Sequence, residues 1–136
     1  MLSEDLKNRL LLAASKAREQ AYAPYSGGFK VGAAVLTEEG EIFSGCNIEN
    51  ASFGATMCAE RVAIFEAVSK GHRKIQAVAV VAESPNPVPP CGMCLQVISE
   101  FGQDIDIILA NTEGDVELYN IKELLPKSFK FQHLDE

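Results

Sequence analysis

Apolar residues recur at helical spacing near the start of the chain and predict a first helix. They are Leu6, Leu10, Ala13, Ala14, Ala17 and Ala21. Ser3 stands at the N-cap position, and Glu4 and Asp5 follow in the first turn, where the helix dipole favours acidic side chains. The proline and glycines of 23–28 then end this helix.

The remaining pattern alternates strands with helices. Two apolar segments, 30–36 and 41–47, flank a turn that contains Gly40 and predict a hairpin. Helices are predicted over 58–70 and 92–101, and strands over 75–82, 105–110 and 116–119, with a short helix that ends near Pro126. The continuous apolar character of 75–82 indicates a strand buried on both faces, at the centre of the sheet.

This order of elements predicts an α/β fold with a mixed sheet of about five strands. Each strand-helix-strand unit needs a crossover, so helices pack on the faces of the sheet. The chain has no internal repeat and no long linker, and 47% of its 136 residues are hydrophobic. We therefore expect one domain over 1–136 with a core of its own.

The acidic balance of the chain argues against a nucleic-acid partner. The formal net charge is −7 and the sequence pI is about 4.8, so the average field repels phosphate backbones. The short basic cluster Lys70, His72, Arg73 and Lys74 is interpreted as a solvated helix C-terminus, where cations interact favourably with the negative end of the helix dipole.

The compartment is predicted to be the cytoplasm. The first residues mix charges with leucines, unlike a secretory signal. No segment approaches the roughly 20 apolar residues that span a bilayer, so we expect a soluble protein with no membrane association. In a reducing compartment, the four cysteines are expected to be metal ligands, catalytic groups or core residues rather than disulfides.

Two of the cysteines form the motif Pro90-Cys91-Gly92-Met93-Cys94 at a predicted helix start. This spacing puts two thiols within reach of one ion, and the positive end of the helix dipole favours their thiolate forms. The motif alone also suits a redox pair or half of a structural zinc site.

A third cysteine sharpens the prediction, because Cys58-Ala59-Glu60 also stands at a helix start. Cys58, Cys91 and Cys94 can present three thiolates to one zinc ion and leave its fourth tetrahedral position for water, as in catalytic sites. Cys46 lies inside a predicted strand and is interpreted as a small buried hydrophobic residue.

The two residues after Cys58 have candidate roles of their own. Glu60 can take a proton from a water at the metal and deliver it to a leaving nitrogen; without the cysteines it would be a first-turn glutamate favoured by the dipole. Arg61 is either a donor to the ligand sulfurs, offsetting the charge of three thiolates, or a surface arginine.

These motifs resemble those of the zinc deaminases, in which a metal ligand, one residue and a glutamate precede Pro-Cys-x-x-Cys. More narrowly, nearly the whole chain resembles the small homotetrameric cytidine deaminases of pyrimidine salvage. The matching stretches are Tyr22-Ala23-Pro24-Tyr25-Ser26, Phe29 to Ala34 ending in Val31-Gly32-Ala33-Ala34, Gly45-Cys46-Asn47-Ile48-Glu49-Asn50-Ala51, both cysteine motifs and Glu123-Leu124-Leu125-Pro126.

The resemblance implies a three-layer α/β/α fold and hydrolysis of cytidine and deoxycytidine to uridine and deoxyuridine, with one Zn²⁺ per subunit. It also implies that Asn47 and Glu49 bind the ribose hydroxyls and that Ala59 contacts the substrate. Phe29 would pack on the base, and Phe129 would reach the base in a neighbouring subunit of a homotetramer. Without the resemblance, these polar residues suit a strand end and the two phenylalanines suit a core.

Three positions depart from the family pattern. The turn at Gly27 and Gly28 is one residue longer, Leu95 replaces an arginine that often follows the last cysteine, and Met93 replaces an alanine. None of these changes the set of metal ligands.

Three other functions remain open from the sequence. The enzyme could act on a nucleoside analogue or on cytosine within a polynucleotide. A closed zinc module that binds a partner would need Cys46 as a fourth ligand, and a redox protein would leave Cys58 and Glu60 without a task.

Overall fold

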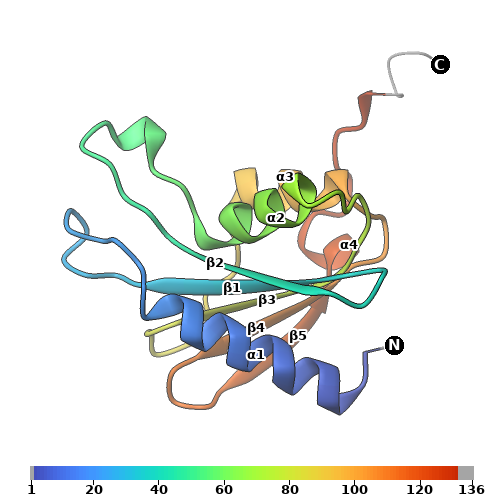
Figure 1. Ribbon diagram of the computed structural model, residues 1–136, viewed down its shortest axis with the longest axis horizontal. Helices are drawn as coiled ribbons and strands as arrows, with labels where there is room; N and C mark the ends of the chain where they lie inside the picture. Colours follow the sequence, from blue (N-terminus) through green and yellow to red (C-terminus); the bar gives the residue numbers. More distant parts are fainter. Residues whose placement is uncertain (1, 132–136) are drawn as a thin grey trace.

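The computed structural model describes residues 2–131, in which five strands form one sheet with helices on both faces (Figure 1). The elements follow the predicted order and lie close to the predicted bounds. They are α1 (Glu4–Arg18), β1 (Val31–Thr37), β2 (Ile42–Cys46), a 3-10 helix (Phe53–Ala55), α2 (Ala59–Ser69), β3 (Ile75–Ala82), α3 (Gly92–Glu100), β4 (Asp106–Asn111), β5 (Val116–Asn120) and α4 (Ile121–Leu124).

The strand order β2-β1-β3-β4-β5 makes a mixed sheet, as predicted. β3 and β4 are parallel and are joined through α3, whereas the other neighbours are antiparallel. β3 lies at the centre, and seven of its eight residues are buried. This burial on both faces is the physical reason that its sequence is apolar without alternation.

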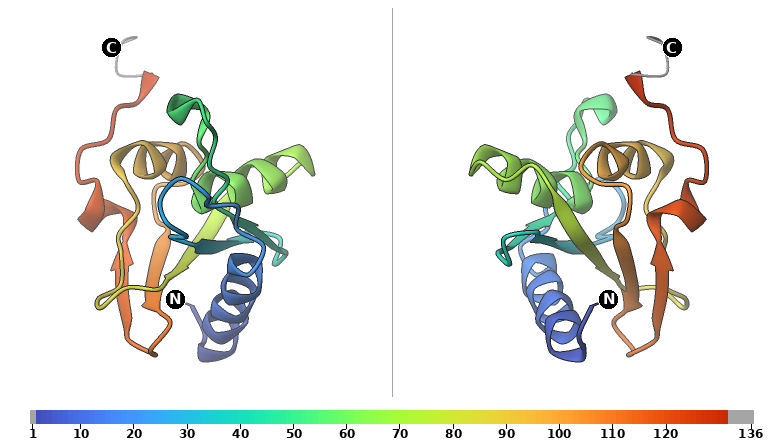
Figure 2. Two further views of the ribbon diagram at one scale, coloured as in Figure 1. Left: turned by 90° about the vertical axis from the view of Figure 1, so that its left-hand side faces the viewer. Right: turned by 90° about the vertical axis from the view of Figure 1, so that its right-hand side faces the viewer.

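Side chains alternate between two cores, one on each face of the sheet. On one face, Leu10 and Ala14 of α1 pack against Ala34 and Leu36 of β1. On the other face, α2 and α3 cover a larger cluster that includes Val35 (Figure 2). The fold therefore has the three layers expected. None of the helices between residues 2 and 131 is long and apolar enough to cross a membrane.

Two glycines let helices approach the sheet closely, one on each face. A Cβ atom at Gly32 would lie 1.9 Å from the carbonyl oxygen of Ala14 in α1. A Cβ atom at Gly45 would lie 2.7 Å from the backbone nitrogen of Ala63 in α2. Backbone atoms cannot rotate away, so any side chain here would push the helix off the sheet.

The first helix ends at Arg18, three residues before the predicted Ala21. The reason is a competing interaction with a distant segment. The backbone nitrogen of Tyr22 donates to the carbonyl of Asn47 at 3.0 Å, and that of Glu49 donates to the carbonyl of Tyr22 at 2.8 Å. This strand-like pairing needs an extended backbone, which local helical periodicity does not reveal.

The basic cluster is structural, as its helix-end interpretation predicted. The Arg73 guanidinium donates to the carbonyl of Val68 at 2.8 Å, in the last turn of α2. His72 contacts Glu39 at 2.9 Å and Glu41 at 2.6 Å, which ties this helix end to the β1–β2 hairpin.

We predict that Gly45→Ala lowers the free energy of unfolding by about 2–3 kcal/mol, because the new methyl group overlaps the α2 backbone. Urea unfolding followed by circular dichroism measures the change. Gly54→Ala is the matched control, since a Cβ atom there meets nothing within 4 Å, and it should change stability by less than about 0.5 kcal/mol. Equal stability of the two variants would contradict the close-approach argument.

Candidate active site

The predicted metal ligands lie at the starts of two helices on the same face of the sheet. Cys58 is the N-cap residue of α2 and Cys91 that of α3, and neither side chain makes a capping hydrogen bond. Cys94 lies in the first turn of α3. Both helix N-termini therefore direct unpaired N–H groups and positive dipole ends toward the thiols, which favours thiolates.

The three sulfur atoms converge, as the sequence predicted. The Sγ atoms of Cys58, Cys91 and Cys94 all lie within 4.8 Å of one another. Two sulfurs bound to one zinc ion at about 2.3 Å and a tetrahedral angle are roughly 3.8 Å apart, so small adjustments suffice to ligate a metal. Cys46 is half-buried in β2 and is not in this group, which argues against a closed four-cysteine site.

Burial is graded across the cluster. Cys94 is buried, Cys58 is partly exposed and Cys91 is exposed. A closed structural site would need a fourth protein ligand, and no other His, Cys, Asp or Glu among residues 2–131 joins these three. Three soft donors with one accessible side fit a zinc ion that keeps a position open for water.

The electrostatics of the thiols favour a charged Cys58. A hydrogen bond from the Cys94 thiol, with further help from the Arg61 guanidinium, lowers the pKa of Cys58 to about 5. The same Cys94–Cys58 contact raises the pKa of Cys94, which is held as the donor. A divalent ion bound here would favour loss of the proton that Cys94 retains.

Arg61 donates to a sulfur of the cluster, which favours its interpretation as a donor to the ligand sulfurs. Its Nη2 atom donates to Cys58 Sγ at 3.3 Å. Its Nε atom is buried and has no hydrogen-bond partner among residues 2–131. A guanidinium with one buried, unmet donor fits a cluster that carries more negative charge than one thiolate.

Glu60 is buried beside these ligands, with only 5% of its surface exposed. Burial raises its pKa to about 7, and the nearby Cys58 thiolate contributes in the same direction. A carboxyl group with this pKa can both accept and donate a proton near neutrality. Ala59, between the ligand and the glutamate, is fully buried.

A short pairing connects this centre to Asn47 and Glu49. Ile48 and Met57 exchange two backbone hydrogen bonds of 2.9 Å in an antiparallel bridge. The register places Asn47 opposite Cys58, and Glu49 follows on the same side because side chains alternate. The chain thus brings a predicted sugar-binding amide and carboxylate beside the first metal ligand.

Asn47 and Glu49 already shape the loop that they would use to bind a substrate. Asn47 Oδ1 accepts from the backbone of Val31, and its Nδ2 donates to the carbonyl of Phe29, both at 2.8 Å. Glu49 Oε1 accepts from the backbone nitrogens of Tyr25 at 2.7 Å and Ser26 at 3.0 Å. Within residues 2–131, one amide hydrogen of Asn47 and the Oε2 atom of Glu49 make no hydrogen bond and can meet a ligand.

Glu49 is held in its ionised form. The Ser26 side chain and the backbone N–H groups of Tyr25 and Ser26 lower the pKa of Glu49. An ionised carboxylate accepts hydrogen bonds and cannot donate one, which suits a hydroxyl donor.

Phe29 is placed next to Asn47 despite the longer turn before it. Gly27 and Gly28 both have positive φ, at 77° and 91°, and the Phe29 nitrogen donates to Ser26 Oγ at 3.1 Å. Phe29 is 41% exposed, so its ring is not a core side chain. The sequence motifs assigned no role in the site to Ser26. Its position before two turn glycines is the sequence feature that indicates a side chain bonded to the turn backbone.

Phe129 does not join the other predicted site residues. It is 58% exposed, and its carbonyl accepts from Gln96 Nε2 at 3.1 Å. Figure 1 shows the C-terminal segment on the opposite side of the molecule from the loops that precede β1 and follow β2.

The two family departures on α3 have different environments. Leu95 is buried in the core cluster between the sheet, α2 and α3, where it packs against apolar side chains and offers no hydrogen-bond donor. Met93 is 66% exposed and leaves the ligand set unchanged.

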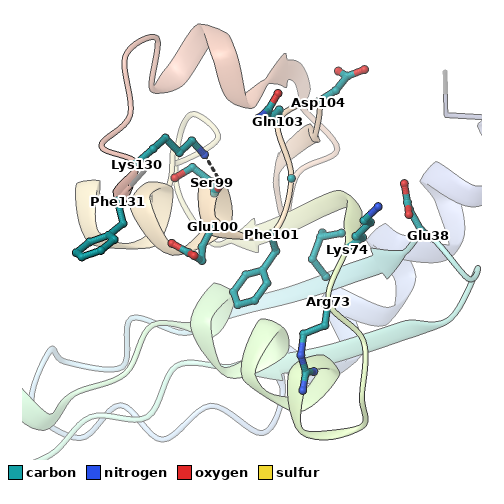
Figure 3. Close-up of a pocket in the computed structure, with 12 residues that line it drawn as sticks. Glu38, Arg73, Lys74, Ser99, Glu100, Phe101, Gln103, Asp104, Lys130 and Phe131 are labelled. Atoms are coloured by element: carbon teal, nitrogen blue, oxygen red, sulfur yellow. Dashed lines mark hydrogen bonds between the residues drawn. The ribbon is translucent and has the colours of Figure 1, made fainter. Parts of the chain in front are cut away.

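One surface hollow lies away from this centre. Its volume is about 580 Å³, and Figure 3 shows Phe101, Lys130 and Phe131 among its walls. Its lining includes none of the three converging cysteines. The set of converging thiols, rather than this hollow, therefore locates the candidate site.

Comparisons with known proteins agree with this arrangement. Residues 4–110 match the family model described as the cytidine and deoxycytidylate deaminase zinc-binding region. A cytidine deaminase of Sporosarcina psychrophila is 50% identical over 127 residues, covering 93% of each chain. One of Halalkalibacterium halodurans is 47% identical over 131 residues, covering 96% of this chain and 98% of the relative.

A solved structure is similar in fold as well as in sequence. The crystal structure of cytidine deaminase from Burkholderia pseudomallei superposes with a TM-score of 0.87 at 46% identity. The match covers 94% of this chain and all of the other.

We predict that Cys58→Ser, Cys91→Ser and Cys94→Ser each lose tightly bound zinc, because each removes one thiolate from the cluster. Cys46→Ser is the matched control and should retain about one zinc per chain. Metal analysis after gel filtration measures the content. Loss of zinc from Cys46→Ser as well would show that the site is closed by a fourth cysteine.

Proposed function

The chain belongs to the cytidine and deoxycytidylate deaminase family, and from this premise we propose that it hydrolyses cytidine and deoxycytidine to uridine and deoxyuridine plus ammonia. The observation that carries the proposal is the convergence of three thiols beside a buried glutamate with a pKa near 7. The enzyme is a zinc-dependent hydrolase with a role in pyrimidine salvage.

Cys58, Cys91 and Cys94 would hold one zinc ion. When bound, zinc supplies Lewis acidity that makes a water molecule a nucleophile near neutral pH. Arg61 offsets part of the negative charge that three thiolates bring, through its contact with Cys58.

Glu60 moves the protons. It accepts one proton from the attacking water as the oxygen adds to C4 of cytosine, and passes that proton to N3, which gives a tetrahedral intermediate. It then takes the second proton from the new C4 hydroxyl and delivers it to the exocyclic amino group, so that the C4–N bond breaks, ammonia leaves and the C4 carbonyl of uridine forms. Burial supports both steps, because it holds the pKa of Glu60 near the pH at which the reaction runs.

Asn47 and Glu49 bind the sugar in this proposal. Asn47 offers one free N–H donor, and Glu49 offers one free carboxylate oxygen. A donor and an acceptor together satisfy a single hydroxyl group. Phe29 packs on the base, and Ala59, next to Glu60, contacts the substrate in this proposal.

The substrate is a free nucleoside rather than a polynucleotide. The net charge of −7 and the ionised Glu49 both disfavour a phosphate backbone. Competition by cytidine, and none by an oligonucleotide that contains cytosine, is the expected result in a turnover assay.

We further propose a cytoplasmic homotetramer in which Phe129 reaches the base of a neighbouring subunit. The exposure of Phe129 and its separation from the other site residues support a role outside its own subunit. The reduced thiols that the centre needs support a cytoplasmic location. Sedimentation that gave a fully active monomer would contradict the contribution of Phe129 in trans.

Glu60→Gln should keep the zinc and lose turnover, because the amide preserves shape but cannot shuttle a proton. We expect kcat for cytidine to fall at least about 10³-fold, at the level of a lost general acid and base. Uridine and ammonia are quantified in parallel with zinc content. Substantial turnover by the zinc-loaded variant would remove Glu60 from the mechanism.

Removing one sugar hydroxyl from the substrate should lower kcat/KM far more than removing the other, because the Asn47–Glu49 pair satisfies a single hydroxyl. Since deoxycytidine is a proposed substrate, the pair reads the 3′-hydroxyl. We expect kcat/KM to fall at least about 100-fold for 3′-deoxycytidine, because loss of the 3′-hydroxyl leaves both the Asn47 amide and the Glu49 carboxylate unpaired. The 2′-deoxy substrate serves as the control, and similar losses for both would contradict the assignment.

A further inference from the structure

Both backbone polar groups of Phe29 make hydrogen bonds to side chains. The Phe29 nitrogen donates to Ser26 Oγ at 3.1 Å, and its carbonyl accepts from Asn47 Nδ2 at 2.8 Å. On the other side of Lys30, the Val31 nitrogen donates to Asn47 Oδ1 at 2.8 Å. Asn47 therefore fixes both sides of Lys30 and leaves the Lys30 carbonyl to another partner.

That partner is Arg18, at the end of α1. Its Nε atom donates to the carbonyl of Lys30 at 3.1 Å, and the arginine side chain is only 21% exposed. Its Nη2 atom lies 3.6 Å from Glu83 Oε1, but Glu83 is 77% exposed, so this ion pair contributes little. The partly buried hydrogen bond from a charged donor to the carbonyl is the stronger contact.

The reach of Arg18 is set by the contact between α1 and β1. A Cβ atom at Gly32 would lie 2.7 Å from the backbone nitrogen of Arg18 and 1.9 Å from the Ala14 carbonyl oxygen. The helix backbone thus rests directly on the strand, two residues after Lys30. Because the Arg18 backbone is fixed against β1, the position of α1 determines where the Arg18 side chain holds the Lys30 carbonyl.

We propose that Arg18 is a positioning residue that sets the orientation of Phe29 by fixing the Lys30 carbonyl. The inference rests on the proposed function, because the contact between Phe29 and the cytosine base belongs to it. Arg18 itself touches no substrate in this account. It acts through the backbone that carries the aromatic ring.

The alternative role for Arg18 is that of a cation at the negative end of the α1 dipole. Lys16 occupies the same last turn and is exposed, and its side chain makes no hydrogen bond or ion pair within residues 2–131. Lys16→Ala removes a cation and keeps the Lys30 contact. It is therefore the matched control for Arg18→Ala.

The kinetic test compares these variants in the zinc-loaded enzyme. Arg18→Ala should raise KM for cytidine about tenfold, at the level of one lost charged hydrogen bond, with kcat within about twofold. Arg18→Lys, which keeps one donor, should show a smaller rise, and Lys16→Ala should show none. In a Phe29→Ala background, Arg18→Ala should raise KM less than about twofold, because the residue through which it acts is gone.

A second test does not depend on activity. The chain contains no tryptophan, so Phe29→Trp places a single fluorophore at the position in question. Adding Arg18→Ala should lower the fluorescence anisotropy and raise the acrylamide quenching constant about twofold, since one of the contacts that hold the backbone beneath the ring is lost. Adding Lys16→Ala should leave both unchanged.

Two results would overturn the positioning role. One is an equal rise in KM on Arg18→Ala with and without Phe29, and the other is unchanged fluorescence of Trp at position 29 in a folded Arg18→Lys or Arg18→Ala variant. Absence of cytidine turnover in the unmutated protein would overturn the proposed function instead. The fluorescence comparison would still decide whether Arg18 positions residue 29.

Discussion

The site depends on two helices that begin at one point on the same face of the sheet. Only there can Cys58 from α2 join Cys91 and Cys94 from α3, with all three sulfurs within 4.8 Å. Gly45 allows the α2 backbone to approach the sheet closely, and the parallel pair β3–β4 sets the crossover that carries α3. The N-termini of both helices then stabilise the negative charge of the thiolates.

The first turn of α2 combines several tasks of the proposed chemistry. Cys58 ligates, Arg61 offsets charge at the ligand, and Glu60 transfers protons, with its pKa raised by the same burial that excludes water. The pairing of Ile48 with Met57 then brings Asn47 and Glu49 beside this turn. Metal, acid–base and sugar-binding groups are thereby held by adjacent backbone rather than by long side chains, which limits their freedom.

Much of this could be predicted from the chain. Periodicity identified the helices and the buried strands, because one face or both faces of each element are covered. The spacing of the cysteines identified the metal centre, since ligand number and helix starts restrict the chemistry. The proposed sugar-binding roles of Asn47 and Glu49 came from the family resemblance, and the bridge between Ile48 and Met57 is the contact that ties their segment to the start of α2.

The remaining features arise from contacts between distant segments. The end of α1 at Arg18 is set by the pairing of Tyr22 with 47–49, and helical spacing alone could not show it. The direction of Arg61 and the partner of Arg18 were likewise open, because an arginine on a helix gives no local sign of which acceptor it meets. Gly32 and Gly45 are understood only through the helices that lie against them.

The most direct test of the account is the coordination of zinc in the intact protein, measured by X-ray absorption spectroscopy at the zinc edge. The account predicts three sulfur neighbours at about 2.3 Å and one oxygen or nitrogen neighbour at about 2.0 Å, as in a metal site that is open to water. Four sulfur neighbours would contradict it, because the ion would then be enclosed by protein and the chemistry proposed for Glu60 would have no place to occur.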